Sequence, residues 1–378
     1  MKQLIHCCFT SHNEVMFRDR DDVNYFLNVL ATTSWAYGIE IFADVEMSNH
    51  VHLLVMASEG KESRLISGTA VKTVEKDGLS RTGKIQYSSS DRLSYFVSAV
   101  RKKMTRHFYE KYDRKNCGRL GERSYFSLLV QGNYHMISAC SYVLRNPMHH
   151  GVAVTPFSYP YSSANDIFPV ELGKTDRPYP GISSIESYRM NMQGKWVKKC
   201  SNDRSANTAG NIILPPGYAP ITGKAAIRNY LPRDTEFPDE WIMSPEGVFL
   251  RPCFEELRQT EMLFASASAF EYNMFRKTDE KWLQEQNQDR NGLSLVRLDE
   301  IEPLHSNRDI ETYLKNERNR TYVKCFNDFD VCRIVDHDIL PEFHHKSIYQ
   351  LTDAEKLQVR KILINEIHVP DFQASRCI

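Results

Sequence analysis

Two histidines separated by one residue are the first pair in the sequence whose spacing could do chemistry. His50 and His52 stand in an otherwise apolar run, residues 51–55. Side chains alternate along a β-strand, so both imidazoles would project from the same face. Two neutral imidazoles placed in this way can share one divalent metal ion. The alternative interpretation is a pair of partly buried histidines held by hydrogen bonds.

A tyrosine further along the chain could supply a nucleophile, which a metal ion alone does not provide. Helical periodicity over residues 133–146 predicts an apolar stripe of Met136, Ile137, Cys140, Val143 and Leu144. Steps of about 100° per residue then place Tyr142 on the opposite face, away from the core. Asn146 follows one turn later, so its amide oxygen could hold a metal beside the phenolate. A surface tyrosine on an amphipathic helix is the alternative.

The elements that must position these residues follow from the same patterns. Strands are predicted at residues 3–10, 39–45, 50–56 and 124–130, and helices at residues 20–37, 91–111 and 133–146. The order β-α-β-β-α-β-α predicts an α+β fold, an antiparallel sheet with helices on one face. Residues 58–90 are polar and interrupt this order as a long insertion.

Charge is concentrated in one part of the chain. The whole sequence balances 48 basic against 48 acidic residues, but residues 92–123 hold ten Lys or Arg against three Asp or Glu. On the helix 91–111, Lys102 and Arg106 share the non-core face with Tyr95 and Tyr109. Cations meet phosphates and rings stack on bases, so this face suits single-stranded nucleic acid. The alternative is a solvated helix face.

Four segments together resemble one family, the single-tyrosine HUH transposases, especially the REP-associated tyrosine transposases and their insertion-sequence relatives. The segments, in the family's order, are Met47-Ser-Asn-His-Val-His-Leu-Leu-Val55, Leu120-Gly-Glu-Arg-Ser-Tyr-Phe-Ser-Leu-Leu-Val130, Ser141-Tyr-Val-Leu-Arg-Asn-Pro-Met-His-His-Gly151 and Tyr159-Pro-Tyr-Ser-Ser163. The resemblance covers about residues 1–168. It implies a ferredoxin-like nuclease domain with the histidine pair on a central strand.

The resemblance also implies roles for individual residues. His50 and His52 match the family's histidine metal ligands, Tyr142 matches the nucleophile, and Asn146 matches the third ligand. The implied cofactor is Mg²⁺ or Mn²⁺, and the implied substrate is single-stranded or hairpin DNA. The implied reaction cleaves and rejoins that DNA through a 5′-phosphotyrosine intermediate.

Several of these assignments leave alternatives open. Glu46 and His149 are the other candidates for the third ligand. The expected DNA-binding residues are Arg101, Lys102, Arg106, Arg119 and Arg123. Residues 119–124 depart from the family's usual glycine-arginine-phenylalanine pattern, and relatives include both monomers and homodimers. Two other functions fit the same residues: a catalytically silent regulator that binds hairpin DNA, and a metal hydrolase that forms no covalent adduct.

Three regions are expected overall: the HUH tyrosine transposase domain (1–168), an irregular linker (169–240) and a helical region (241–378). The helix predicted at residues 352–367 has Thr352 as its N-cap and Glu355 at the capping-box position. It and the residues after it look like the start of a helix-turn-helix. No apolar run approaches the 18 to 20 or so residues that span a membrane. We therefore expect a cytoplasmic protein without membrane contact and with reduced cysteines.

Overall fold

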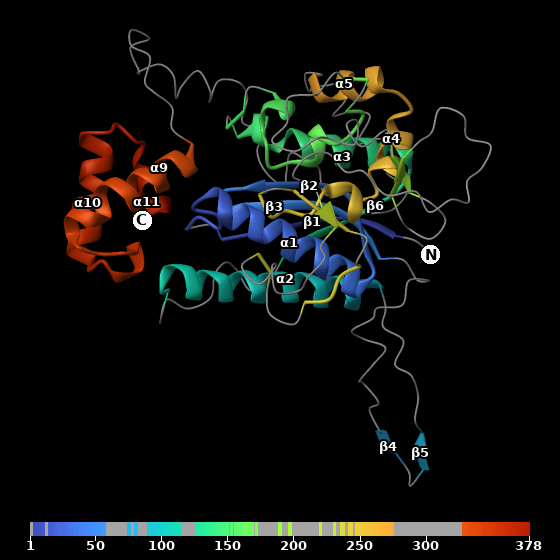
Figure 1. Ribbon diagram of the computed structural model, residues 1–378, viewed down its shortest axis with the longest axis horizontal. Coiled ribbons are helices and arrows are strands. Elements are labelled where there is room, and N and C mark those ends of the chain that lie inside the picture. The colour runs from blue at the N-terminus through green and yellow to red at the C-terminus, as the bar shows by residue number, and fades with distance from the viewer. Residues whose placement is uncertain are drawn as a thin grey trace.

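The computed structural model describes the chain in separate stretches (Figure 1). These are residues 3–11, 14–57, 74–76, 79–81, 89–114, 125–150, 152–153, 155–169, 171–172, 188–190, 196–198, 219–220, 230–231, 235–238, 241–244, 246–275 and 327–378. Most of the predicted insertion at 58–90 and of the predicted linker at 169–240 lies outside them.

Four antiparallel strands form the central sheet. They are β1 (Gln3–Thr10), β2 (Ile39–Met47), β3 (His50–Ala57) and β6 (Phe126–Val130), in the order β2-β3-β1-β6. Helices join β1 to β2 and β3 to β6, which gives the β-α-β-β-α-β order of a ferredoxin-like fold. The predicted α+β class and the four predicted strands are confirmed.

Two helices cover one face of this sheet (Figure 1). α1 (Arg20–Tyr37) begins at a capping box between Asp19 and Asp22 and ends at Gly38, whose φ of 65° is costly for a residue with a Cβ. α2 (Ser89–Tyr112) packs beside α1. Their apolar side chains meet those of alternate strand residues, including Val51, in the largest buried cluster.

The opposite face carries a second layer of helices, so the expectation of helices on one face is wrong, because the apolar stripe of α3 (Asn133–His149) packs on this other side of the sheet (Figure 1). α3 lies against the sheet, and α4 (Leu257–Phe264) and α5 (Ala267–Phe275) pack on α3. Phe264 and Phe270 join the buried cluster that contains Val143 and Leu144 of α3. Residues more than 100 positions later in the chain therefore complete the core on this face.

One strand of the sheet contains a β-bulge. Ile41 pairs with Val55, but Ala43 pairs with Leu54, so Phe42 is an extra residue on β2. A bulge shifts the alternation of side chains on the strand that contains it. Beyond Phe42, the odd-numbered residues of β2 therefore face α3, whereas before it they face α1 and α2.

The edge of β2 is covered by the segment 159–163, one of the four motifs. The Tyr159 hydroxyl donates to the backbone carbonyl of Glu46 at 2.6 Å, and the amide of Glu46 donates to the carbonyl of Tyr161 at 3.0 Å. The Ser163 hydroxyl accepts from the amide of Asp44 at 3.0 Å. An exposed strand edge invites pairing with other chains, so this motif protects β2.

The C-terminal residues form a small helical unit. α9 (Asp328–Ile334), α10 (Asp353–Asn365) and α11 (Asp371–Cys377) surround a cluster that also takes in Val15. The predicted capping box of Thr352 and Glu355 is confirmed at the start of α10. α10 and α11 are the two helices expected at the end of the chain, and α11 buries Ala374 and Cys377 inside this unit.

The remaining elements are short. They are β4 (Val74–Lys76), β5 (Leu79–Arg81), β7 (Tyr188–Met190), β8 (Trp196–Lys198), β9 (Ala219–Pro220), β10 (Ile242–Met243), and the helical turns η1 (Pro156–Ser158), η2 (Ser163–Asn165), η4 (Arg251–Cys253), η5 (Val335–Ile339), η6 (Leu340–Phe343) and η7 (Ile348–Gln350).

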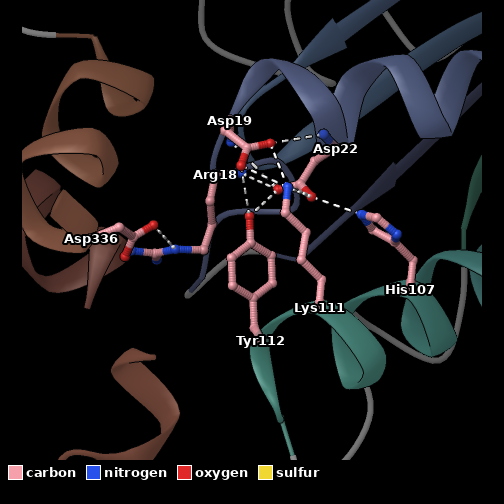
Figure 2. A network of polar contacts seen from close by, with 7 residues as sticks. All are labelled: Arg18, Asp19, Asp22, His107, Lys111, Tyr112 and Asp336. Atoms are coloured by element: carbon pink, nitrogen blue, oxygen red, sulfur yellow. Dashed lines mark hydrogen bonds and ion pairs between the residues drawn. The ribbon is translucent and has the colours of Figure 1, made fainter. Parts of the chain in front are cut away.

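A polar network ties the C-terminal unit to the sheet domain (Figure 2). The buried Arg18 guanidinium donates to both carboxylate oxygens of Asp336, at 3.0 and 2.6 Å, and to the carbonyl of Cys377 at 2.9 Å. A buried arginine requires such partners, because an unpaired buried charge is strongly destabilising. These contacts hold the C-terminal helices next to the N-terminal end of α1.

The same network joins α1 to α2 through Asp22 (Figure 2). This fully buried carboxylate accepts from the Tyr112 hydroxyl at 2.7 Å, from Lys111 at 2.9 Å and from His107 at 2.8 Å. Burial raises the pKa of Asp22, but the hydrogen bonds and charges of His107 and Lys111 outweigh it and lower this pKa to about 2. Asp22 is therefore ionised at neutral pH.

Candidate active site

The two histidines of β3 lie on the sheet face that α3 covers. His50 is 5% exposed and His52 is fully buried. Their ring centroids are 5.1 Å apart. Both side chains leave the strand on the same face, because successive side chains alternate between faces. The predicted strand and the shared face of the two imidazoles are both confirmed.

Asn146 reaches His50 from α3. Its side-chain Oδ1 lies 2.9 Å from Nε2 of His50, and Oδ1 of Asn49 lies 2.8 Å from Nδ1 on the other side of the ring. A neutral imidazole carries only one N–H. If His50 donates it to Asn49, then Nε2 presents a lone pair to the oxygen of Asn146.

In that tautomer, the His50 nitrogen and the Asn146 oxygen are both acceptors, and such a pair would fit a divalent cation. Two ligands about 2.1 Å from an octahedral ion, at right angles to each other, lie about 3 Å apart, close to the separation of the His50 nitrogen and the Asn146 oxygen. Nδ2 of Asn146 is buried without a hydrogen-bond partner among the described residues. The described residues contain no group of three or more His, Cys, Asp or Glu arranged for a metal.

Tyr142 lies among the histidines, one turn before Asn146. Its ring centroid is 5.5 Å from that of His52, 5.6 Å from that of His6 and 6.0 Å from that of His149. Tyr142 is only 4% exposed. The prediction that it is not a core residue is wrong, because α3 is enclosed on both its faces. Its polar face packs on the histidines of the sheet, and its apolar stripe packs on β2, α4 and α5.

Two neighbours of His52 were not predicted from the sequence. Nε2 of the fully buried His6 lies 3.0 Å from Nδ1 of His52, and the two rings stack with an interplanar angle of 18°. On the other side of the ring, Sγ of Cys8 lies 3.8 Å from Nε2 of His52. Both residues belong to β1. The available signal was alternation on that strand, which places His6 and Cys8 on one face.

The two other candidates for the third ligand, Glu46 and His149, lie in different places. Glu46 pairs with Val51 and so leaves the sheet on the side opposite His50. Its carboxylate instead contacts buried Arg251 at 3.2 Å. The expectation that Glu46 could share a metal with these histidines is wrong. His149 stacks on Tyr142, whereas the ring of the next residue, His150, lies 4.9 Å from that of His50.

Arg251 contacts four buried carboxylates. It lies 3.1 Å from Asp44, 2.9 Å from Glu255 and 3.6 Å from Asp166, in addition to Glu46. Burial raises the pKa of Glu46 and that of Glu255, and the charge of Asp44 adds to both effects. This cluster joins residues 251–255 to β2.

The three expected DNA-binding residues that the structure describes are not brought to the histidines. Arg101, Lys102 and Arg106 belong to α2, which covers the other face of the sheet. Lys102 is exposed, and Arg106 is exposed and paired with Glu110 at 2.8 Å. Arg119 and Arg123 lie outside the described residues.

Other basic residues of this region have internal partners. Lys111 contacts Asp19 and Asp22, and the buried Arg114 contacts Glu14 at 2.6 Å. Part of the positive charge in residues 92–123 therefore stabilises the fold. None of the helices in the described part of the chain is long and apolar enough to cross a membrane.

The fold is thus a ferredoxin-like sheet. It carries a histidine pair on a central strand and a tyrosine on a helix that covers the sheet. One solved structure similar to this chain is a REP-associated tyrosine transposase bound to a REP hairpin. The two sequences are 12% identical, and the match covers 47% of this chain and 82% of that chain with a TM-score of 0.29. Another is a proposed transposase from Deinococcus radiodurans R1, 17% identical, covering 36% and 85% with a TM-score of 0.24. No protein-family model and no curated protein matches the chain.

Proposed function

We propose that this protein is a transposase that cleaves and rejoins single-stranded DNA at hairpin ends, with Tyr142 as its nucleophile. One observation supports this above the others. Tyr142, His52 and the His50–Asn146 pair, which come from a helix and a strand far apart in the sequence, meet in one buried cluster. The same residues carry the sequence resemblance.

Each residue would have a defined role in the reaction. His50, His52 and Asn146 would hold Mg²⁺ or Mn²⁺, which polarises a phosphate and stabilises charge on its oxygens. Oη of Tyr142 would attack phosphorus, and the bond from phosphorus to the 3′-oxygen would break. The departing oxygen takes up the proton that the tyrosine loses, so the products are a 5′-phosphotyrosine and a free 3′-hydroxyl.

The test is adduct formation by the full chain. Hairpin DNAs carrying a 5′ or a 3′ label are incubated with the protein and Mn²⁺ or Mg²⁺ and run on a denaturing protein gel. We expect a shifted band that carries only the 3′ fragment and disappears with chelator or in Tyr142→Phe. Tyr134→Phe, on the same helix, is the matched control and should still form the adduct. Cleaved DNA without any adduct would instead indicate a metal hydrolase.

One observation favours a second function. Because Tyr142 is 4% exposed, the described conformation does not present it to a DNA strand. A catalytically silent regulator that binds hairpins through the same fold would have no need to expose it. Hairpin binding without adduct or cleavage, with both metals and many hairpins, would select this function.

A further inference from the structure

The histidine of β1 stands beside the proposed metal site without belonging to the proposed ligand set. His6 and His52 are both fully buried, and only 3.0 Å separates Nε2 of His6 from Nδ1 of His52. At this distance the two nitrogens share one hydrogen. The nitrogen that carries this hydrogen decides whether Nε2, the other nitrogen of His52, has a lone pair for a metal ion.

Two arrangements are available to the pair. If His6 donates, Nδ1 of His52 is the acceptor, so neutral His52 carries its hydrogen on Nε2 and cannot ligate a metal there. If His52 donates from Nδ1, its Nε2 keeps a lone pair. The Cys8 thiol, 3.8 Å from Nε2, is a weak donor and so complements the second arrangement.

We propose that His6 is a positioning residue that accepts a hydrogen bond from Nδ1 of His52 and so keeps Nε2 of His52 available for a divalent cation. Metal-bound histidines commonly need such a partner on their other nitrogen, because it fixes both tautomer and ring orientation. The near-parallel stacking of the two rings adds a second restraint on orientation. This role rests on the metal site of the proposed function.

The fold explains why this residue can act in this way. β1 lies between β3 and β6 in the sheet, and Cys8 pairs directly with His52. His6, two residues earlier, is therefore the diagonal neighbour of His52 on the same face. Its ring is also 5.6 Å from that of Tyr142, so its position is restrained from both the sheet and α3.

The first measurement needs no metal. Nitrogen-15 NMR of the imidazole rings in the metal-free full-length protein, with the His52 signals assigned by their loss in His52→Ala, reports the tautomer of His52 directly. We expect hydrogen on Nδ1 of His52. Hydrogen on Nε2 would overturn the proposal, whether or not the protein binds metal.

The second measurement is Mn²⁺ binding by calorimetry. His6→Phe keeps a ring but removes the acceptor, and we expect a loss of about 10- to 100-fold in Mn²⁺ affinity, the usual effect of removing an outer-shell partner. His6→Gln keeps an acceptor oxygen and should recover part of the affinity. Tyr134→Phe, on α3, is the control and should bind Mn²⁺ like the wild type.

The outcomes separate this proposal from the proposed function. Unchanged affinity in a folded His6→Phe, beside a wild type that binds Mn²⁺ and forms the adduct, would overturn the role of His6 alone. A wild type that binds no Mn²⁺ would overturn the proposed metal site, and the tautomer measurement would still decide what His6 does to His52.

Discussion

The amide oxygen of Asn146 lies 2.9 Å from Nε2 of His50, although 96 positions separate the two residues in the chain. In the proposed metal site, a residue of α3 would thus add a ligand to those that β3 supplies. The ferredoxin-like topology brings this about by placing α3 across the face on which the two histidines project. The arrangement can be tested one residue at a time.

Replacing Asn146 should affect metal binding before anything else. Asn146→Ala removes the oxygen that faces His50, and we expect Mn²⁺ affinity to fall by about tenfold or more, at least the size of an outer-shell effect. Asn146→Asp keeps an oxygen at the same position and should bind Mn²⁺ as well as the wild type or better. Calorimetry decides the matter, and equal affinity for the alanine variant would remove Asn146 from the ligand set.

The buried carboxylate of Asp22 should make stability depend on pH in acid. Its pKa in the folded protein, about 2, lies below the ordinary 3.8, so its contribution is complete above pH 4 and is lost as the pH falls toward 2. The shift corresponds to about 2 kcal/mol. Asp22→Asn should therefore be destabilised at pH 7 by roughly this amount, and the difference from wild type should shrink toward pH 2.

Urea unfolding at pH 7, 4 and 2.5 measures this dependence. Asp21→Asn is the matched control, because Asp21 is an exposed neighbour in the same first turn of α1. A difference between Asp22→Asn and wild type that stays constant across this range would contradict the assignment.

Asp328 should couple the C-terminal helices to the turn that precedes His50. Its buried carboxylate accepts from Ser48 in that turn, from Gln373 at 2.9 Å and from Arg376 at 2.7 Å. Asp328→Ala removes the acceptor for all three, and we expect a loss of about 3 kcal/mol in unfolding free energy. Amide hydrogen exchange at residues 48–50 should become faster. Asp338→Ala, at an exposed acid of the same helical unit, should change neither quantity.

The exposed basic residues of α2 should contribute to DNA binding without affecting the chemistry. Because α2 lies on the face opposite the histidines, charge reversal at Lys102 should weaken hairpin binding and leave the rate of adduct formation by bound DNA unchanged. Removal of one lysine–phosphate pair should reduce the slope of log affinity against log salt by about 0.7. Lys361→Glu, at an exposed position on α10, is the control. An unchanged slope for Lys102→Glu would exclude Lys102 from the DNA interface.

The sheet and the histidine pair could be predicted because each depends on local pattern. An apolar run with the period of a strand places His50 and His52 on one face wherever that strand lies in the fold. The capping box of Thr352 and Glu355 is equally local, and it too is confirmed.

The position of Tyr142 could not be predicted in the same way. An apolar stripe shows which side of a helix packs against apolar neighbours, but a helix enclosed on both sides also buries its polar side. α4 and α5, which pack on α3, come more than 100 residues later. The contact between His6 and His52 joins two strands, and no periodicity within β3 reveals its partner in β1.

The bulge at Phe42 sets the chemical character of the site's border. In a regular β2, with Phe42 paired like its neighbours, every later residue of the strand would face the other way. The carboxylates of Asp44 and Glu46 would then stand beside the two histidines of β3, where apolar side chains lie now. The histidines would share their surface with two anions, a harder ligand environment. The β-bulge in β2 could thus alter the metal preference of the site although none of the proposed ligands changes.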